Sequence, residues 1–291
     1  MQMSHLAKAL IVNFAYRVHS EASIRYFSAR AYQQNFGPTP KTLKDDTGFS
    51  EKIYFRKIWD RNPEMSRMAD KVLVKEIVRS RIGDRYVIPT LWNGTDMSSL
   101  RTTMKSLTEP FVVKANHGSG WNIFVRNAAE RKYEEIVEKC RAWLSQTYGR
   151  TRGEWLYSGI EPQILIEPYI SGLSGLPIDY KFFVFSGKAH YIQIDTDRET
   201  NHKRCFYDTS WTKQSFELGF PLEPAEIERP ASLDEMIHAA ESLVRDFSFA
   251  RVDFYEIEGV PLFGETTFYP GSGLEKFTPT HWNERLGQLW H

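Results

Sequence analysis

The chain contains 291 residues, of which 41% are hydrophobic and 14% aromatic, and its 37 basic residues equal its 37 acidic residues. This length accommodates one large domain or two smaller ones, and the composition is that of a globular protein rather than a disordered chain. The lack of net charge argues against a general polyanion-binding protein, so we do not expect nucleic acid as a partner.

The N-terminal part is predicted to be mainly helical over about the first sixty residues, with a Gly-Pro-Thr-Pro turn at 37–40. Residues 6–16 are apolar and are followed by arginines, so this helix could contact the inner membrane peripherally or pack on its own domain. No apolar run approaches the roughly 18 to 20 residues that cross a bilayer. The N-terminus also lacks a continuous apolar core followed by a small-residue cleavage site, so we expect a cytoplasmic protein. Cys140 and Cys205 fit buried or incidental thiols of a reducing compartment.

The central part of the chain changes from helix to strand. A helix is predicted over residues 70–82, where apolar residues recur at helical spacing. Two short β-rich runs at 111–114 and 122–125 enclose a glycine-containing loop, which predicts a strand, a loop and a strand. A helix with one apolar face follows over about 129–146.

The C-terminal half is predicted to consist of β-hairpins with helices between them. The elements are a strand at 163–167, a hairpin over 180–195 turning at 186–188, a helix over 233–247 and a hairpin over 249–267 turning at 258–259. Strands that arrive as hairpins pair antiparallel, so we predict largely antiparallel sheets and the α+β class.

Two carboxylates in the last hairpin indicate a metal site. Asp253 and Glu265 fall on neighbouring predicted strands, where two bare carboxylates would repel each other. Oxygen ligands of this kind suit Mg²⁺ bridging nucleotide phosphates. By strand alternation Arg251 shares a face with Asp253, and Thr267 shares one with Glu265. Burying such charges without a ligand is costly, so the pattern favours a functional site for ATP chemistry.

Two further patterns fit phosphate binding, although each has a plainer alternative. Glycines in the loop 116–120 let backbone N–H groups turn toward an anion, and Lys114 at the end of the preceding strand adds a positive charge. A tight hairpin explains the same loop. Asp179 and Lys181 share a face of their strand, where the alternative is a solvated ion pair.

Taken together and in this order, these residues resemble the ATP-grasp superfamily and, within it, the TupA-like group associated with cell-surface polysaccharide biosynthesis. Each matching stretch is loose by itself, and the order of all six is what makes the resemblance specific. The stretches are 70–71 with 87–89, 111–120, 164–170, 179–187, 251–255 and 264–273.

The resemblance implies an ATP-grasp fold of the α+β class, in which two α+β subdomains with largely antiparallel sheets grip ATP. It implies a mainly helical N-terminal region over residues 1–68 and an ATP-grasp domain over 69–291. Within that domain, a lid subdomain would cover about 107–165 and a C-terminal catalytic subdomain about 166–291.

The resemblance also implies roles for individual residues in binding ATP. Lys114 and Lys181 would hold phosphates, His117, Gly118, Ser119 and Gly120 would form the mobile lid, Ile166, Glu167 and Tyr169 would form the hinge strand that reads adenine, and Asp179 would lie near the ribose.

For the metal and the reacting group, the resemblance implies that Asp253 and Glu265 bind Mg²⁺ and that Arg251 lies at the transferred phosphoryl group. The superfamily usually has Asn two residues after the metal-bridging Glu. Here Thr267 stands in that place, and its hydroxyl can still ligate Mg²⁺.

The segment that follows residue 195 is dense in hydrogen-bond donors. Arg198 and Arg204 could hold the acceptor carboxylate in a fork, and His202 could act on the amine or the acyl phosphate. An ordinary charged surface loop is the alternative.

The function that this resemblance implies is an ATP-dependent carboxylate–amine ligase acting through an acyl phosphate. The acceptor would be a uronic-acid carboxylate of a surface polysaccharide or its precursor, and the donor an amino acid or another amine. A kinase for a sugar hydroxyl would need much of the same apparatus, and a non-catalytic nucleotide-binding module is a third hypothesis.

Overall fold

The computed structural model describes residues 20–291, apart from residue 45 and residues 172–176 and 198–199. The apolar segment 6–16 and Arg198 therefore lie outside the described residues. The chain folds into two compact units. The first contains the residues up to Gly37, Lys57–Val72 and Thr90–Tyr169, and the second contains Pro38–Arg56, Leu73–Pro89 and Ile170–His291. Among the described residues, no helix is long and apolar enough to cross a membrane.

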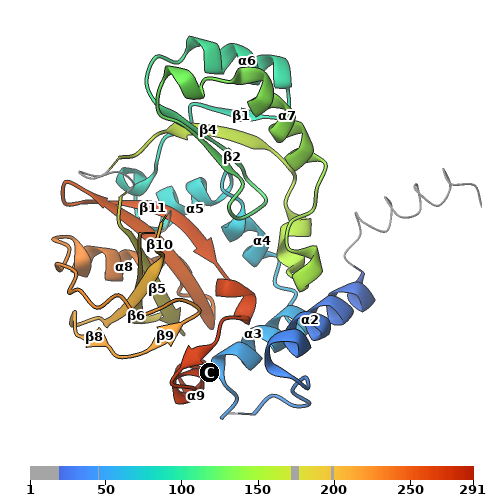
Figure 1. The fold of residues 1–291 in the computed structure, drawn as a ribbon, viewed down its shortest axis with the longest axis vertical. Coiled ribbons are helices and arrows are strands. Elements are labelled where there is room, and N and C mark those ends of the chain that lie inside the picture. Colours follow the sequence, from blue (N-terminus) through green and yellow to red (C-terminus); the bar gives the residue numbers. More distant parts are fainter. Residues whose placement is uncertain (1–19, 45, 172–176, 198–199) are drawn as a thin grey trace, which may run out of the picture. The chain divides into compact units, whose positions relative to one another are not determined.

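The first unit is built on a four-stranded antiparallel sheet in the order β1-β4-β2-β3. Its strands are β1 (Trp92–Gly94), β2 (Phe111–Ala115), β3 (Asn122–Val125) and β4 (Ile164–Pro168). Two helices, α6 (Met97–Ser106) and α7 (Tyr133–Leu144), cover the sheet (Figure 1). Their buried apolar residues, such as Met104 and Cys140, share one core with Val113 of β2.

The remainder of the first unit is helical. It comprises α2 (Glu21–Phe36), the end of α3 (Phe49–Trp59), α4 (Glu64–Ala69) and 3₁₀ turns at Ala128–Glu130, Arg150–Arg152 and Trp155–Gly159. Helix α2 begins after Ser20, whose hydroxyl accepts the N–H of Ser23 and so satisfies a free donor of the first turn.

The second unit is built on a six-stranded antiparallel sheet in the order β11-β10-β5-β6-β7-β8. The strands are β5 (Asp179–Phe185), β6 (Lys188–Thr196), β7 (Lys203–Asp208), β8 (Lys213–Gln214), β10 (Phe249–Ile257) and β11 (Val260–Thr267). Two short strands, β9 (Glu217–Leu218) and β12 (Phe277–Thr278), form a separate pair. The helices are the start of α3, α5 (Val74–Arg81), α8 (Leu233–Val244) and α9 (His281–Gln288), with 3₁₀ turns at Asp84–Tyr86 and Pro270–Gly273.

Both predicted hairpin turns are confirmed. Ser186 and Gly187 join β5 to β6, and Glu258 and Gly259 join β10 to β11. All four residues have positive φ, at 46°, 77°, 52° and 79° in chain order. Two-residue turns of this kind match the right-handed twist of the strands that they connect. The antiparallel sheets and the α+β class therefore agree with the prediction.

Two predicted helices are shorter than expected. The helix expected over 70–82 is α5, which begins at Val74, because the Asp70 carboxylate accepts the N–H of Val72 and holds the preceding residues in a turn. The helix expected over 129–146 is α7, preceded by a 3₁₀ turn. Such boundaries depend on local caps rather than on the apolar repeat.

The six-stranded sheet is filled differently on its two faces. On one face, Glu256 of β10 accepts the N–H of Ser232, the residue just before α8, and this helix covers the apolar side chains there. On the opposite face, Phe49 of α3 meets aromatic side chains of the strands. Its ring centroid lies 6.0 Å from that of Phe183, 6.1 Å from that of Phe185 and 5.0 Å from that of Phe249.

We expect Phe49→Ala to lower the free energy of unfolding by about 3–5 kcal/mol, because it empties the centre of this aromatic cluster. Phe49 is only 2% exposed. The matched control is Leu43→Ala, at a side chain that is 48% exposed, where the loss should stay within about 0.5 kcal/mol. Guanidinium unfolding followed by tryptophan fluorescence measures both. Similar losses in the two variants would contradict the packing described.

Candidate active site

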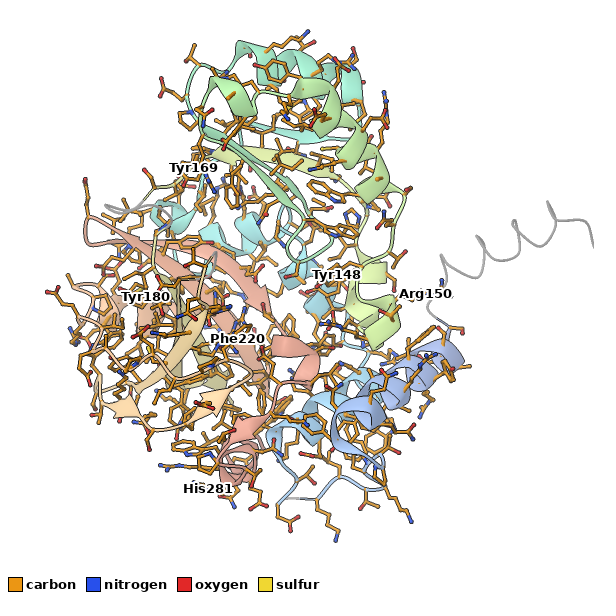
Figure 2. The ribbon with its side chains drawn as sticks, viewed as in Figure 1. Tyr148, Arg150, Tyr169, Tyr180, Phe220 and His281 are labelled. Atoms are coloured by element: carbon orange, nitrogen blue, oxygen red, sulfur yellow. The ribbon has the colours of Figure 1, made fainter. Side chains whose placement is uncertain are left out.

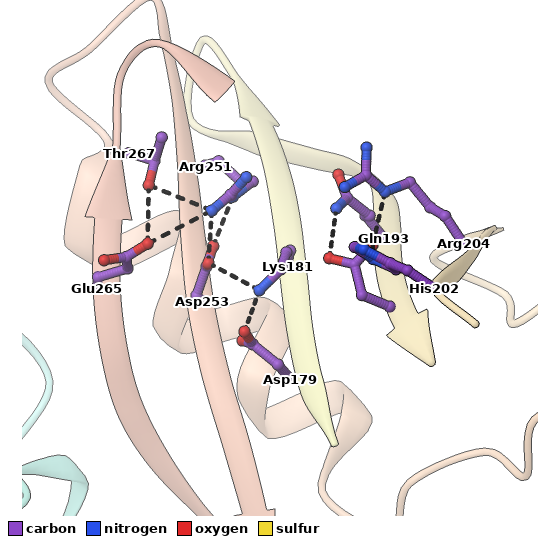
Figure 3. A network of polar contacts seen from close by, with 10 residues as sticks. Asp179, Lys181, Gln193, His202, Arg204, Arg251, Asp253, Glu265 and Thr267 are labelled. Atoms are coloured by element: carbon purple, nitrogen blue, oxygen red, sulfur yellow. Dashed lines mark hydrogen bonds and ion pairs between the residues drawn. The ribbon is translucent and has the colours of Figure 1, made fainter. Parts of the chain in front are cut away.

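Charged residues cross three strands of the second unit on one face of the sheet. Cross-strand pairing places Asp253 of β10 directly opposite Glu265 of β11 on one side and Lys181 of β5 on the other. Arg251 is opposite Thr267 in the same way. Directly opposite residues share a face, so the alternation read from the sequence brings these side chains together (Figure 3).

Asp253 is the centre of this network. Its Oδ1 accepts from Nε of Arg251 and its Oδ2 from Nη2 of Arg251, each at 2.7 Å. Lys181 Nζ lies 3.2 Å from Oδ2 of Asp253 and also donates to Asp179. The bidentate pair with Arg251 is the stronger kind of charge-assisted contact.

The network is buried, and its two cations are charged. The side chains of Lys181, Asp179 and Asp253 are exposed by 7%, 7% and 2%. Burial opposes the charge on Lys181, but Asp179 and Asp253 outweigh it and raise the pKa of the ammonium. Burial likewise opposes the charge on Arg251, and the Asp253 carboxylate raises its pKa. Both cations therefore stay protonated at neutral pH.

The edge of the network toward β11 has the oxygen donors that a hard cation requires. The Glu265 side chain is 32% exposed, and its Oε1 lies 3.6 Å from Arg251 Nη2 and 3.4 Å from the Thr267 hydroxyl. A bulge at Gly264 precedes Glu265, since Asp253 pairs with Glu265 but the next residue pairs with Phe263. The described residues contain no group of three or more His, Cys, Asp or Glu suited to a metal. Two carboxylates and a hydroxyl nevertheless fit Mg²⁺, which keeps several waters and takes few protein ligands.

A second cluster continues across β6 and β7. Asp195 Oδ1 accepts from Nε of Arg204 at 2.6 Å and lies 3.2 Å from Nε2 of His202, while Gln193 donates to Oδ2 at 2.9 Å. Arg204 also donates to the Leu218 carbonyl at 2.6 Å. His202 and Arg204 therefore both contact Asp195, whereas Arg198 lies outside the described residues.

Gln193, Asp195 and Glu275 are members of this cluster that the sequence analysis did not select. Glu275 Oε2 accepts from Arg204 Nη1 at 3.1 Å. Gln193 is opposite Lys181, so the second cluster adjoins the first. Polar residues at alternating positions of β6 were a usable signal for Gln193 and Asp195. Glu275 comes from a distant loop, and no local pattern marks it.

The residues selected in the first unit lie on neighbouring strands and on the loop between β2 and β3. Lys114 Nζ lies 2.6 Å from Oε2 of Glu167, and the Lys114 side chain is 22% exposed. The Ile166 side chain is fully buried in the core of that unit. The ring centroid of Tyr169, labelled in Figure 2, lies 5.9 Å from that of Phe124.

The glycine loop of the first unit is anchored at its base. The two ring nitrogens of His117 contact Oδ1 of Asn116 at 2.9 Å and the carbonyl of Trp143 at 3.0 Å, and burial lowers the pKa of this imidazole. A Cβ at Gly118 would lie 2.8 Å from the Trp121 ring, whereas Gly120 has a φ of 71°. Ser119 and Gly120 are exposed. The assignments of this loop and of the hinge to ATP stay predictions.

The sequence and fold place the chain in a family. The family model described as TupA-like ATP-grasp matches residues 51–291, so the chain belongs to the TupA-like ATP-grasp family. No curated protein is similar enough in sequence to count as a match.

Two of the solved structures that are similar to this chain are ligases. The L-amino acid ligase from Bacillus licheniformis is 16% identical, with a TM-score of 0.51 over 93% of this chain and 60% of that one. The D-alanine–D-alanine ligase from Bacillus anthracis is 19% identical, with a TM-score of 0.47 over 77% of this chain and 66% of that one. This chain therefore spans no more than about two thirds of the length of either structure.

We expect Asp253→Asn to lower the free energy of unfolding by about 3–5 kcal/mol, because it leaves the buried charges of Arg251 and Lys181 without their shared carboxylate. Glu265→Gln changes a partly exposed carboxylate of the same face and should cost no more than about 1 kcal/mol. Urea unfolding of the two variants checks the difference. An equal loss, or a larger one for Glu265→Gln, would contradict the central place of Asp253.

Proposed function

We propose that the protein is an ATP-dependent carboxylate–amine ligase that acts through an acyl phosphate. The observation that carries the proposal is the continuous charged face formed by β11, β10 and β5 in a chain of the TupA-like ATP-grasp family. It combines carboxylates suited to a metal with fixed cations suited to phosphates, which is the apparatus that phosphoryl transfer requires.

Each residue of the face has a chemical task in this proposal. Asp253, Glu265 and Thr267 hold Mg²⁺, which neutralises charge on the ATP phosphates when bound. Lys181 and Arg251 are fixed cations that stabilise the phosphoryl group as it passes to the acceptor carboxylate. Asp179 keeps Lys181 charged, as the raised pKa of that lysine indicates.

The first unit supplies further ATP contacts in this proposal. Lys114 binds phosphate, the loop from His117 to Gly120 closes over it, and residues 166–169 read the adenine. The partly exposed Lys114 side chain supports this, since a fixed ammonium beside a glycine loop can reach an anion.

The acceptor and the amine bind near the second cluster in this proposal. Arg204 donates hydrogen bonds to Asp195 and Glu275, and its guanidinium carbon lies 4.7 Å from the ring centroid of Phe220. These contacts hold the guanidinium in one position, so it acts as a fixed positive charge near the acceptor. The acceptor is a uronic-acid carboxylate of a surface polysaccharide or its precursor, and the donor is an amino acid or another amine. The glycan context follows from the family alone, and the reaction takes place in the cytoplasm.

We expect Lys114→Ala to weaken ATP binding by about tenfold or more, because it removes a fixed positive charge from the phosphates. Because the change also removes the ion-pair partner of the buried Glu167 carboxylate, circular dichroism first checks that the variant is folded. Lys105→Ala, at an exposed lysine of α6, is the matched control and should bind ATP as the unmodified chain does. Titration calorimetry with Mg²⁺ and ATP measures both. Unchanged binding in Lys114→Ala would place the phosphates elsewhere.

The intermediate can be traced with labelled oxygen. In an acyl phosphate, one oxygen of the acceptor carboxylate bridges carbon and phosphorus, so it must leave with the phosphate when the amine displaces it. An acceptor labelled in both carboxylate oxygens should therefore give one labelled oxygen in the inorganic phosphate for each amide formed, as mass spectrometry can show. Label in AMP would indicate an adenylating ligase, and ADP without released phosphate would indicate a kinase. Either result would contradict the proposal.

A further inference from the structure

His202 lies between a carboxylate and an aromatic ring. Its imidazole stacks on Phe220, labelled in Figure 2, with ring centroids 3.7 Å apart and planes inclined by 29°. Its Nε2 lies 3.2 Å from Oδ1 of Asp195, a close charge contact without the alignment of a hydrogen bond. Its side chain is 23% exposed, whereas that of Asp195 is 5% exposed. The ring therefore packs on Phe220 and is partly exposed.

The charge on Asp195 decides which ring nitrogen carries the proton. Burial opposes ionisation of Asp195, but the neighbouring Arg204 guanidinium holds the pKa of that carboxyl well below its usual value. An ionised carboxylate only accepts hydrogen bonds, so the neutral imidazole facing it carries its proton on Nε2. Nδ1 then keeps its lone pair, which a base requires.

Three charged side chains around His202 are poorly suited to take a proton. Lys181 is already protonated, because its carboxylate neighbours raise its pKa. Arg204 is permanently charged, and Asp195 is a weak base because its pKa is lowered. Histidine is the residue type suited to accept a proton at neutral pH.

We propose that His202 is the base for the amine and that Asp195 is the residue that positions it. The inference rests on the proposed ligase function. As the amine nitrogen bonds to the acyl carbon, the bond from that carbon to the phosphate oxygen breaks and phosphate leaves. The surplus proton of the nitrogen passes to Nδ1 of His202, and Asp195 stabilises the resulting imidazolium.

The first test measures the tautomer directly and needs no substrate. Long-range nitrogen–proton correlation spectra of the whole protein should show neutral His202 with its proton on Nε2. The signal of His202 is identified because it is absent from the spectrum of His202→Gln. In Asp195→Asn this preference should be lost. A proton on Nδ1 of His202 in the unmodified chain would overturn the proposal.

The second test separates base catalysis from binding. Hydroxylamine is largely unprotonated at neutral pH and attacks acyl phosphates without a base, whereas an amino acid amine must first lose a proton. With glucuronate or galacturonate as the acceptor, His202→Gln should slow amide formation from glycine or L-alanine by about a hundredfold or more. Hydroxamate formation from hydroxylamine should change by less than about threefold. His238→Gln, at an exposed residue of α8, is the control and should leave both rates unchanged.

Each outcome bears on one proposal. Equal losses of amide and hydroxamate in His202→Gln would show that His202 serves binding, which overturns the base assignment and leaves the ligase proposal standing. Absence of hydroxamate with the unmodified chain and both uronates would count against the proposed function. The tautomer measurement, which needs no substrate, would then still test whether the proton of His202 is on Nε2. Asp195→Asn should follow His202→Gln in losing amide formation, although it also disturbs Arg204.

Discussion

The rest of the candidate site depends on the charge balance around Asp253. Its buried carboxylate neutralises Arg251 and shares Lys181 with Asp179. In an environment of low permittivity, losing one member of such a set leaves an unbalanced charge whose cost is several kcal/mol. Since the members come from β10 and β5, the contacts also favour one register between these strands.

The charged network lies on a sheet whose two faces are both covered by packed side chains, which keep its strands in place. Helix α8 covers the face opposite the charges, and the aromatic cluster around Phe49 fills the remainder of the charged face. A slip of one residue in β10 would turn Arg251 and Asp253 toward the apolar side under α8, which no ion pair could compensate. The apolar packing and the charges therefore specify the same register.

The two polar clusters are electrostatically connected. Lys181 lies opposite Gln193, which donates to Asp195, and the charge on Lys181 helps to lower the pKa of Asp195. A line of fixed charges thus extends from Glu265 on β11 to Arg204 on β7. In the proposed reaction, such dipoles and charges are set before the substrates arrive and need not reorganise during the chemical step.

The sequence alone determined the local features of this protein. Alternation in 179–181, 251–253 and 265–267 predicted which charges share a face, and Ser186-Gly187 and Glu258-Gly259 predicted the turns, because both signals act over a few residues. Only the tertiary structure decided the partners of each charge. Glu275 reaches Arg204 across 71 residues, and Trp143 meets His117 across 26. Such contacts depend on how distant segments pack, which no local pattern records.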